Sequence, residues 1–185
     1  MTLRNRSLGT ILSERLTEDE KQRYAALLQL KGNKPYLFGD DIYANPSEGE
    51  HYQVPGEVLS DPSFAALITE AEKYLGYPYV WGGSSPSTSF DCSGFVCYVY
   101  THSGVHNLPR TTATGIYNQC AIVSRSEAKP GDLIFFTKTY NSDGPVSHVG
   151  IYVGDGMMIH CGSPIQYANI NSSYWQEHFY AFGRL

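Results

Sequence analysis

The chain has 185 residues, a hydrophobic fraction of 42%, a charged fraction of 17% and a formal net charge of -5. This size and composition predict one folded domain with a modest extension, and they exclude an intrinsically disordered chain. An acidic protein does not attract nucleic acid or anionic lipid, so we expect neither as the main partner. No apolar run is long enough to cross a bilayer, and the first residues lack the continuous apolar stretch of a signal peptide.

The first 60 residues predict an irregular N-terminal extension that carries one helix. Thr17 followed by Glu20 fits a capping box, and an apolar stripe then continues from Tyr24 to Gly32. Prolines and glycines between residues 32 and 56 are too dense for a long regular element. We therefore expect residues 1–60 to form an extension and residues 61–185 to form the compact domain.

Two helices are predicted at the start of the compact domain. Asp61-Pro62 suits the first positions of a helix, and apolar residues recur at helical spacing from Phe64 to Leu75, before Gly76. A second helix, mostly buried, is predicted from Cys92 to Gly104, where glycine is the favoured residue after a helix end.

The chain after these helices predicts strands. Apolar runs at residues 133–136, 146–153 and 157–161 are separated by turn residues, and the aromatic segment 179–185 would close the sheet. A glycine-rich turn at residues 154–156 indicates a hairpin. Helices followed by hairpin-linked strands predict an α+β fold, with N-terminal helices packed on a central antiparallel sheet.

Cys92 stands at the predicted start of the second helix. Unpaired backbone N–H groups and the positive end of the helix dipole favour an anion there, which predicts a lowered thiol pKa and a nucleophile. A small buried packing residue is the alternative reading of such a cysteine. Cys97, Cys120 and Cys161 lack the spacing of a metal site or redox motif, so we expect reduced packing residues, with a Cys120–Cys161 disulfide as an alternative.

Two histidines are predicted to share one face of the hairpin. A three-residue loop at residues 154–156 would place His160 opposite Gly150, and His148 lies two residues from Gly150 on the same face. Their Cβ atoms would then be about 7 Å apart or less. With Cys92 this predicts a Cys-His-His arrangement, in which His148 takes the thiol proton and His160 orients His148. A zinc site formed by the same three residues is an alternative.

Six sequence blocks in a fixed order resemble the NlpC-type cell-wall peptidases of the NlpC/P60 superfamily, over about residues 61–185. The blocks are Pro78-Tyr79-Val80-Trp81-Gly82-Gly83, Asp91-Cys92-Ser93-Gly94, Leu108-Pro109-Arg110-Thr111, Pro130-Gly131-Asp132-Leu133-Ile134-Phe135-Phe136, Ser147-His148-Val149-Gly150-Ile151-Tyr152 and Met158-Ile159-His160. The resemblance implies a papain-like fold and hydrolysis of peptidoglycan stem peptides, typically between D-γ-glutamate and a diamino acid. It also implies Cys92 as the nucleophile, His148 as the base and His160 as the orienting residue.

We expect five residues to bind substrate: Tyr79, Trp81, Asp91, Ser93 and Arg110. The resemblance places Tyr79 near the nucleophile, and it places Asp91 and Ser93 where the amino end of the stem is recognised. A substrate ammonium would suit the carboxylate of Asp91 and the hydroxyl of Ser93. The alternative readings are a helix cap for Asp91, a core position for Trp81 and a structural ion pair for Arg110.

Peptidoglycan stem peptides are therefore the expected partner, with no cofactor, no metal and a monomeric chain. The approach to the domain resembles wall hydrolases of conjugative elements, which implies an extracytoplasmic enzyme whose export signal is absent from this chain. An N-acetylmuramoyl-L-alanine amidase, a lipid acyltransferase and a non-catalytic wall-binding module are the alternative functions.

Overall fold

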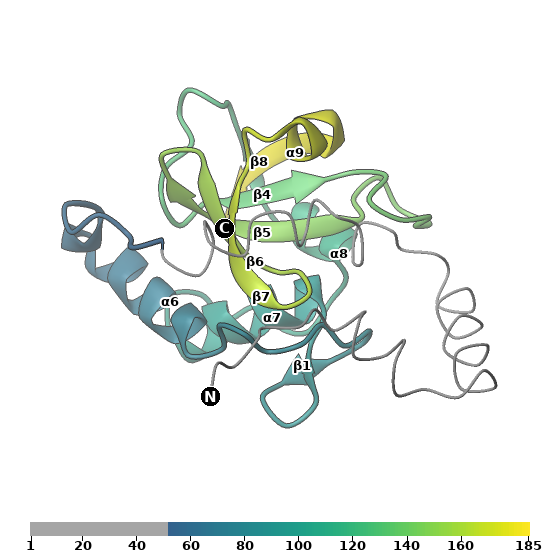
Figure 1. Cartoon of the computed structure of the whole chain (residues 1–185), viewed down its shortest axis with the longest axis horizontal. Helices are drawn as coiled ribbons and strands as arrows, with labels where there is room; N and C mark the ends of the chain where they lie inside the picture. The colour runs from purple at the N-terminus through teal and green to yellow at the C-terminus, as the bar shows by residue number, and fades with distance from the viewer. Residues whose placement is uncertain (1–51) are drawn as a thin grey trace, which may run out of the picture. The chain divides into compact units, whose positions relative to one another are not determined.

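The computed structural model describes residues 52–185 (Figure 1). The predicted helix after Thr17 and most of the predicted linker lie outside these residues, so the division at residue 60 stays a prediction. In the described part, no helix has the length and apolar character needed to span a membrane. The elements in chain order are η1 (Val58–Ser60), α6 (Pro62–Glu72), β1 (Ser84–Ser85), β2 (Ser89–Phe90), α7 (Cys92–His102), α8 (Ala113–Tyr117), β3 (Ala121–Val123), β4 (Leu133–Phe136), β5 (His148–Gly154), β6 (Met157–Cys161), β7 (Ile165–Asn169), α9 (Ser173–His178) and β8 (Phe179–Arg184).

A six-stranded antiparallel sheet forms the centre of the domain, in the order β3-β8-β4-β5-β6-β7. The C-terminal strand β8 pairs with both β3 and β4, so the end of the chain lies inside the sheet and not at its edge. The strands β1 and β2 form a separate small hairpin just before α7. The predicted α+β fold with a central antiparallel sheet is confirmed.

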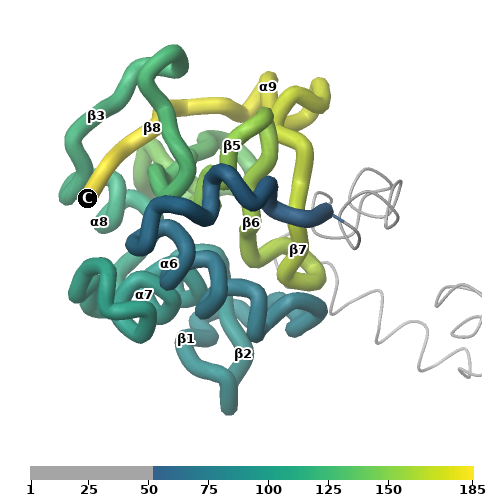
Figure 2. The backbone as a smooth tube through the Cα atoms, turned by 90° about the vertical axis from the view of Figure 1, so that its left-hand side faces the viewer, coloured from purple at the N-terminus to yellow at the C-terminus, as the bar shows by residue number. Residues whose placement is uncertain are grey.

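The sheet is covered by helices on both faces (Figures 1 and 2). Alternate side chains of β4 and β5, such as Phe135 and Val149, join the buried residues of α6 and α7 in the larger hydrophobic core. The intervening side chains Ile134 and Phe136 face a smaller core with Trp175 of α9. This alternation separates the two faces because successive side chains of a strand point in opposite directions.

The caps predicted for α6 are present, but the helix is shorter than its apolar pattern. Asp61 accepts hydrogen bonds from the backbone N–H groups of Ser63 and Phe64, and Pro62 occupies the first turn. The helix ends at Glu72, and Leu75 is 41% exposed, so its predicted place on the buried face is wrong. Seven further elements of the described part were not predicted: η1, β1, β2, α8, β3, β7 and α9.

Candidate active site

Cys92 is the first residue of α7 and is held there by the contacts of Asp91 and Gly94. Asp91 is the N-cap, and its Oδ1 accepts a hydrogen bond of 2.7 Å from the backbone N–H of Gly94. Gly94 packs against the backbone of Gly83, where an added Cβ would lie 2.1 Å from the carbonyl oxygen. The Gly83 carbonyl accepts a hydrogen bond from the Asp91 N–H at 3.0 Å. These contacts fix the start of the helix and leave Cys92 only 5% exposed.

The lowered thiol pKa predicted for Cys92 is wrong for the resting structure. Burial raises the pKa of Cys92 to about 12, and the negative charge of Asp91 raises it further, against the backbone N–H groups of Val149 and Ser93. The cap adds to the effect of burial, because the Gly94 N–H at the helix start already binds the carboxylate of Asp91. The anion that the helix terminus favours is therefore Asp91, and the thiol beside it stays neutral.

The register that joins the two histidines is as predicted, although the turn is not. Gly150 of β5 pairs with His160 of β6. Gly154 pairs with Met157, so the loop has two residues, and both have positive φ: Asp155 at 50° and Gly156 at 72°. A bulge between Tyr152 and Gly154 absorbs the extra residue and restores the predicted pairing.

His148 and His160 form a buried pair. The Nε2 atom of His148 lies 2.9 Å from Nδ1 of His160, and each residue is 3% exposed. Trp175 of α9 packs against both rings, with centroid distances of 5.5 Å to His148 and 5.1 Å to His160. Burial lowers the pKa of His148 well below 6.5 and lowers the pKa of His160 to about 3. Both imidazoles are therefore neutral at pH 7.

The thiol of Cys92 meets the same strand that carries His148. The backbone N–H of Val149, the residue after His148, lies close enough to the Cys92 sulfur to lower the pKa of the thiol. The start of α7 and the start of β5 thus lie together, and the buried thiol belongs to the first of these segments and the buried imidazole of His148 to the second. Such an arrangement can carry out nucleophilic catalysis in which an imidazole accepts the thiol proton.

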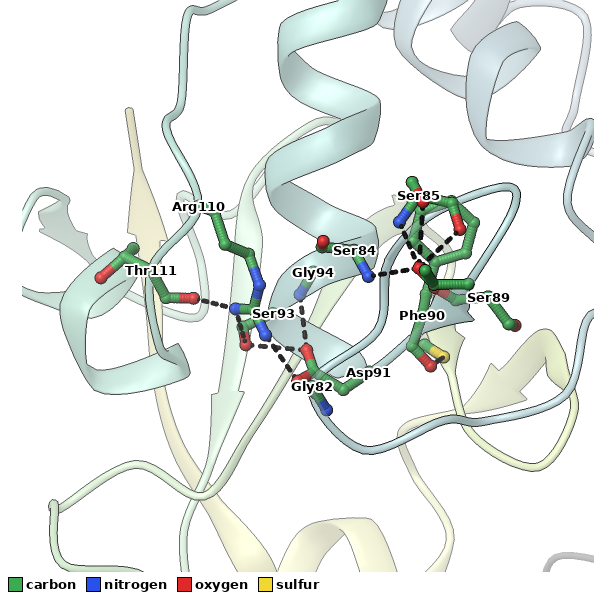
Figure 3. Close-up of polar contacts among 12 residues, drawn as sticks. Gly82, Ser84, Ser85, Ser89, Phe90, Asp91, Ser93, Gly94, Arg110 and Thr111 are labelled. Carbon is green, nitrogen blue, oxygen red and sulfur yellow. Dashed lines mark hydrogen bonds and ion pairs between the residues drawn. The ribbon is translucent and has the colours of Figure 1, made fainter.

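A polar cluster lies beside Cys92 at the start of α7 and consists of Asp91, Ser93 and Arg110 (Figure 3). Arg110 donates from Nη2 to Oδ2 of Asp91 at 2.6 Å and from Nη1 to Oγ of Ser93 at 2.8 Å. Ser93 Oγ donates to Oδ1 of Asp91 at 3.0 Å, and the Gly82 N–H donates to Oδ2 at 3.0 Å. With the Gly94 N–H, the carboxylate of Asp91 accepts four hydrogen bonds. Its geometry is therefore that of a helix cap in an ion pair with Arg110, and not that of a carboxylate open to a substrate ammonium.

The aromatic residues predicted to bind substrate occupy accessible positions. Trp81 is 61% exposed and is not a core residue, while Tyr79 is half-buried and its backbone pairs with Phe90. Tyr140, in the β4–β5 loop, was missed by the sequence reasoning: its ring lies edge-on to Trp81 at 5.4 Å. Burial, together with nearby Cys92, raises the pKa of Tyr140 to about 12. Neither Tyr140 nor Trp175 belongs to a motif that could have identified it.

All four cysteines of the chain, Cys92, Cys97, Cys120 and Cys161, are free thiols. Cys161 is fully buried and donates from Sγ to the carbonyl oxygen of Phe90 at 3.2 Å. Within residues 52–185, no three His, Cys, Asp or Glu side chains are grouped so that they could hold a metal ion.

Comparison with known proteins identifies the family to which the chain is similar. The family model described as the NlpC/P60 family matches residues 76–184. The bifunctional muramidase/DL-endopeptidase CwlT of Bacillus subtilis is 40% identical over 151 residues, which cover 81% of this chain and 42% of CwlT. The probable endopeptidase p60 of Listeria innocua is 49% identical over 121 residues, which cover 65% of this chain and 24% of p60.

A solved structure shows the same fold. The crystal structure of an NLP/P60 family protein, similar to a lipoprotein, from Staphylococcus aureus matches with a TM-score of 0.65 at 45% identity, covering 67% of this chain and 41% of that chain. The chain thus spans less than half the length of the curated relatives CwlT and p60. The family model nevertheless covers more than half of the chain, and the chain belongs to the NlpC/P60 family.

Proposed function

We propose that this chain is a cysteine endopeptidase that hydrolyses peptidoglycan stem peptides at the bond between D-γ-glutamate and a diamino acid. The observation that carries the proposal is the buried hydrogen bond between His148 and His160, on a strand whose next residue contacts the Cys92 sulfur. The names of the relatives, DL-endopeptidase for CwlT and probable endopeptidase for p60, support the reaction class.

The hydrogen bond between the histidines suggests which nitrogen acts as the base. If His148 donates from Nε2 to Nδ1 of His160, the Nδ1 of His148 has no proton and can accept the one from the Cys92 thiol. The sulfur then forms a bond to the scissile carbonyl carbon, and the carbonyl oxygen becomes an oxyanion. His148 returns the proton to the leaving amine as the C–N bond breaks, and water hydrolyses the resulting thioester by the reverse sequence.

The resting pair in this mechanism is a neutral thiol and a neutral imidazole. Burial raises the thiol pKa and lowers the imidazole pKa, so the charged pair is unfavourable before substrate binds. The proton therefore moves to His148 as the sulfur attacks, and not in advance. We assign stabilisation of the oxyanion to the backbone N–H of Cys92, with Tyr79 beside it.

The proposal is tested by digestion of purified cell walls and mass spectrometry of the released peptides. Cys92→Ala should abolish release of fragments cut after D-glutamate, whereas Cys97→Ala, a buried thiol on the same helix, should retain activity. Full activity of Cys92→Ala would end the proposal. Products with a free lactyl end on muramic acid would indicate an amidase, and binding to walls without any product would indicate a non-catalytic module.

The substrate class also bears on location and assembly. Peptidoglycan lies outside the cytoplasmic membrane, so we place the enzyme in the extracytoplasmic space, secreted or associated with the wall. A monomeric state is part of the same proposal, and gel filtration with light scattering would check it.

A further inference from the structure

The guanidinium of Arg110 lies beside the proposed nucleophile and is partly open to solvent. Arg110 bonds to Asp91 and Ser93, the two residues that flank Cys92 in the chain, and its side chain is 38% exposed. Its third hydrogen bond is donated from Nη1 to the backbone carbonyl of Thr111. Figure 3 shows the guanidinium between Thr111 on one side and the Asp91–Ser93 pair on the other.

In the polar cluster, Arg110 has N–H donors that remain unused, whereas the carboxylate of Asp91 has no acceptor position left. The three hydrogen bonds of Arg110 within the described residues use both hydrogens of Nη1 and one of Nη2. An arginine has five N–H donors in a fixed fork, so Nε–H and one Nη2–H remain. The carboxylate of Asp91 already accepts four hydrogen bonds. A ligand at this place would therefore meet hydrogen-bond donors, which suit an anion and not an ammonium group.

The proposed substrate carries such an anion close to the scissile bond. A D-glutamate that is joined through its γ-carboxyl keeps a free α-carboxylate, separated from the scissile carbonyl by a short methylene chain. Arg110 contacts the residues on both sides of Cys92 in the chain, and its positive charge lowers the pKa of the Cys92 thiol, so the guanidinium lies near the sulfur. Carboxylates bind arginine through paired, charge-assisted hydrogen bonds.

We propose that Arg110 binds the free α-carboxylate of the D-γ-glutamyl residue and makes the enzyme selective for D-glutamate over its α-amide, D-isoglutamine. The inference rests on the proposed function and names the substrate group that this part of the site recognises. An α-amide has no charge and presents N–H donors to the donors of Arg110, so the amidated stem should be a poorer substrate.

The test compares two synthetic stem peptides that differ only in an α-carboxylate or an α-carboxamide on the D-glutamyl residue. The wild-type kcat/KM should be about 10-fold to 100-fold higher for the acid, the effect of one charge-assisted hydrogen-bonded contact. Arg110→Gln should bring the ratio close to one by lowering the rate with the acid, and Arg110→Lys should give an intermediate ratio.

Arg184 provides a matched control. It forms an ion pair with the buried Asp132 at 2.6 Å, in the sheet and outside the polar cluster around Cys92. Arg184→Gln should lower the free energy of unfolding and leave the acid-to-amide ratio unchanged. If Arg110→Gln fails to fold, the acid-to-amide ratios of kcat/KM for the wild-type enzyme and for Arg110→Lys still test the inference.

Several results would overturn the inference. A wild-type enzyme that cleaves both peptides equally would refute the role of Arg110 while leaving the proposed endopeptidase intact. An equal loss on both peptides in Arg110→Gln would show that Arg110 is a structural ion pair. Cleavage of neither peptide by wild-type enzyme, with both stems offered free, would refute the proposed bond and this inference together.

Discussion

Gly94→Ala tests whether the close approach of α7 to the segment before it positions Cys92. The new Cβ would lie 2.1 Å from the carbonyl oxygen of Gly83 and 3.1 Å from its carbonyl carbon. These are backbone atoms that cannot rotate away, so overpacking should cost about 3 kcal/mol, the upper end of its usual range. Alanine favours a helix by about 1 kcal/mol over glycine. The free energy of unfolding should therefore fall by about 2 kcal/mol.

The same substitution should reduce activity more than stability. The Gly83 carbonyl accepts the N–H of Asp91, so its displacement moves the residue that precedes Cys92. A shift of about 1 Å at a reacting group can lower kcat/KM about 100-fold. Urea denaturation and stem-peptide kinetics measure the two effects. Gly104→Ala is the control, because its Cβ would meet nothing within 4 Å and only its φ of +76° is strained. Unchanged stability and kinetics in Gly94→Ala would refute the reasoning.

Three further predictions concern the thiol and the histidine pair. Because the pKa of Cys92 is raised to about 12, its alkylation by iodoacetamide should accelerate about tenfold per pH unit with no plateau near neutrality; a plateau near pH 7 would contradict the neutral resting thiol. The pKa of His160 is about 3 in the folded state against 6.5 for the free side chain, so the unfolded state binds more protons between these values. Stability should be full above about pH 6.5, and His160 alone should lower it by about 2 kcal/mol at about pH 5. The loss should be smaller but still present in His160→Asn when urea midpoints are compared, because the pKa of the buried His148 is lowered as well. Trp175→Ala removes the ring that packs on His148 and His160, so it should destabilise the fold by about 3–5 kcal/mol, with Trp175→Phe much closer to wild type in thermal unfolding.

The elements that sequence patterns predicted are those with strong local signals. The caps of α6, the glycine after α7 and the apolar runs of β4 and β6 each have a physical basis within a few residues. The missed strand β7 alternates buried Ile165 and Tyr167 with more exposed residues over only five positions, too short to distinguish from a loop. The six residues of α9 are helical mainly because Trp175 packs in the smaller core. Tertiary contacts determine whether such short segments form a strand or a helix.

The candidate site also has features that the local sequence predicts and features that depend on tertiary contacts. Spacing along the hairpin predicted that His148 and His160 share a face, and the structure reaches this pairing through a two-residue turn and a bulge. The thiol pKa could not be predicted from the sequence, since it depends first on burial of Cys92 in the folded domain and then on the neighbouring charge of Asp91. The saturation of the Asp91 carboxylate likewise depends on Arg110, which lies far along the chain and reaches it only in the folded state.

The bulge in β5 determines which side chain of β6 stands next to His148. Gly154 pairs with Met157, but beyond the bulge Gly150 pairs with His160. If all residues were kept but the bulge were absent, the first pairing would continue along both strands and place Cys161 opposite Gly150. A second thiol would then lie beside the proposed base, and the imidazole of residue 160 would point into the larger core. Deletion of one residue together with the bulge would instead keep His160 opposite Gly150, so the histidine pair requires the length of β5 to match its bulge.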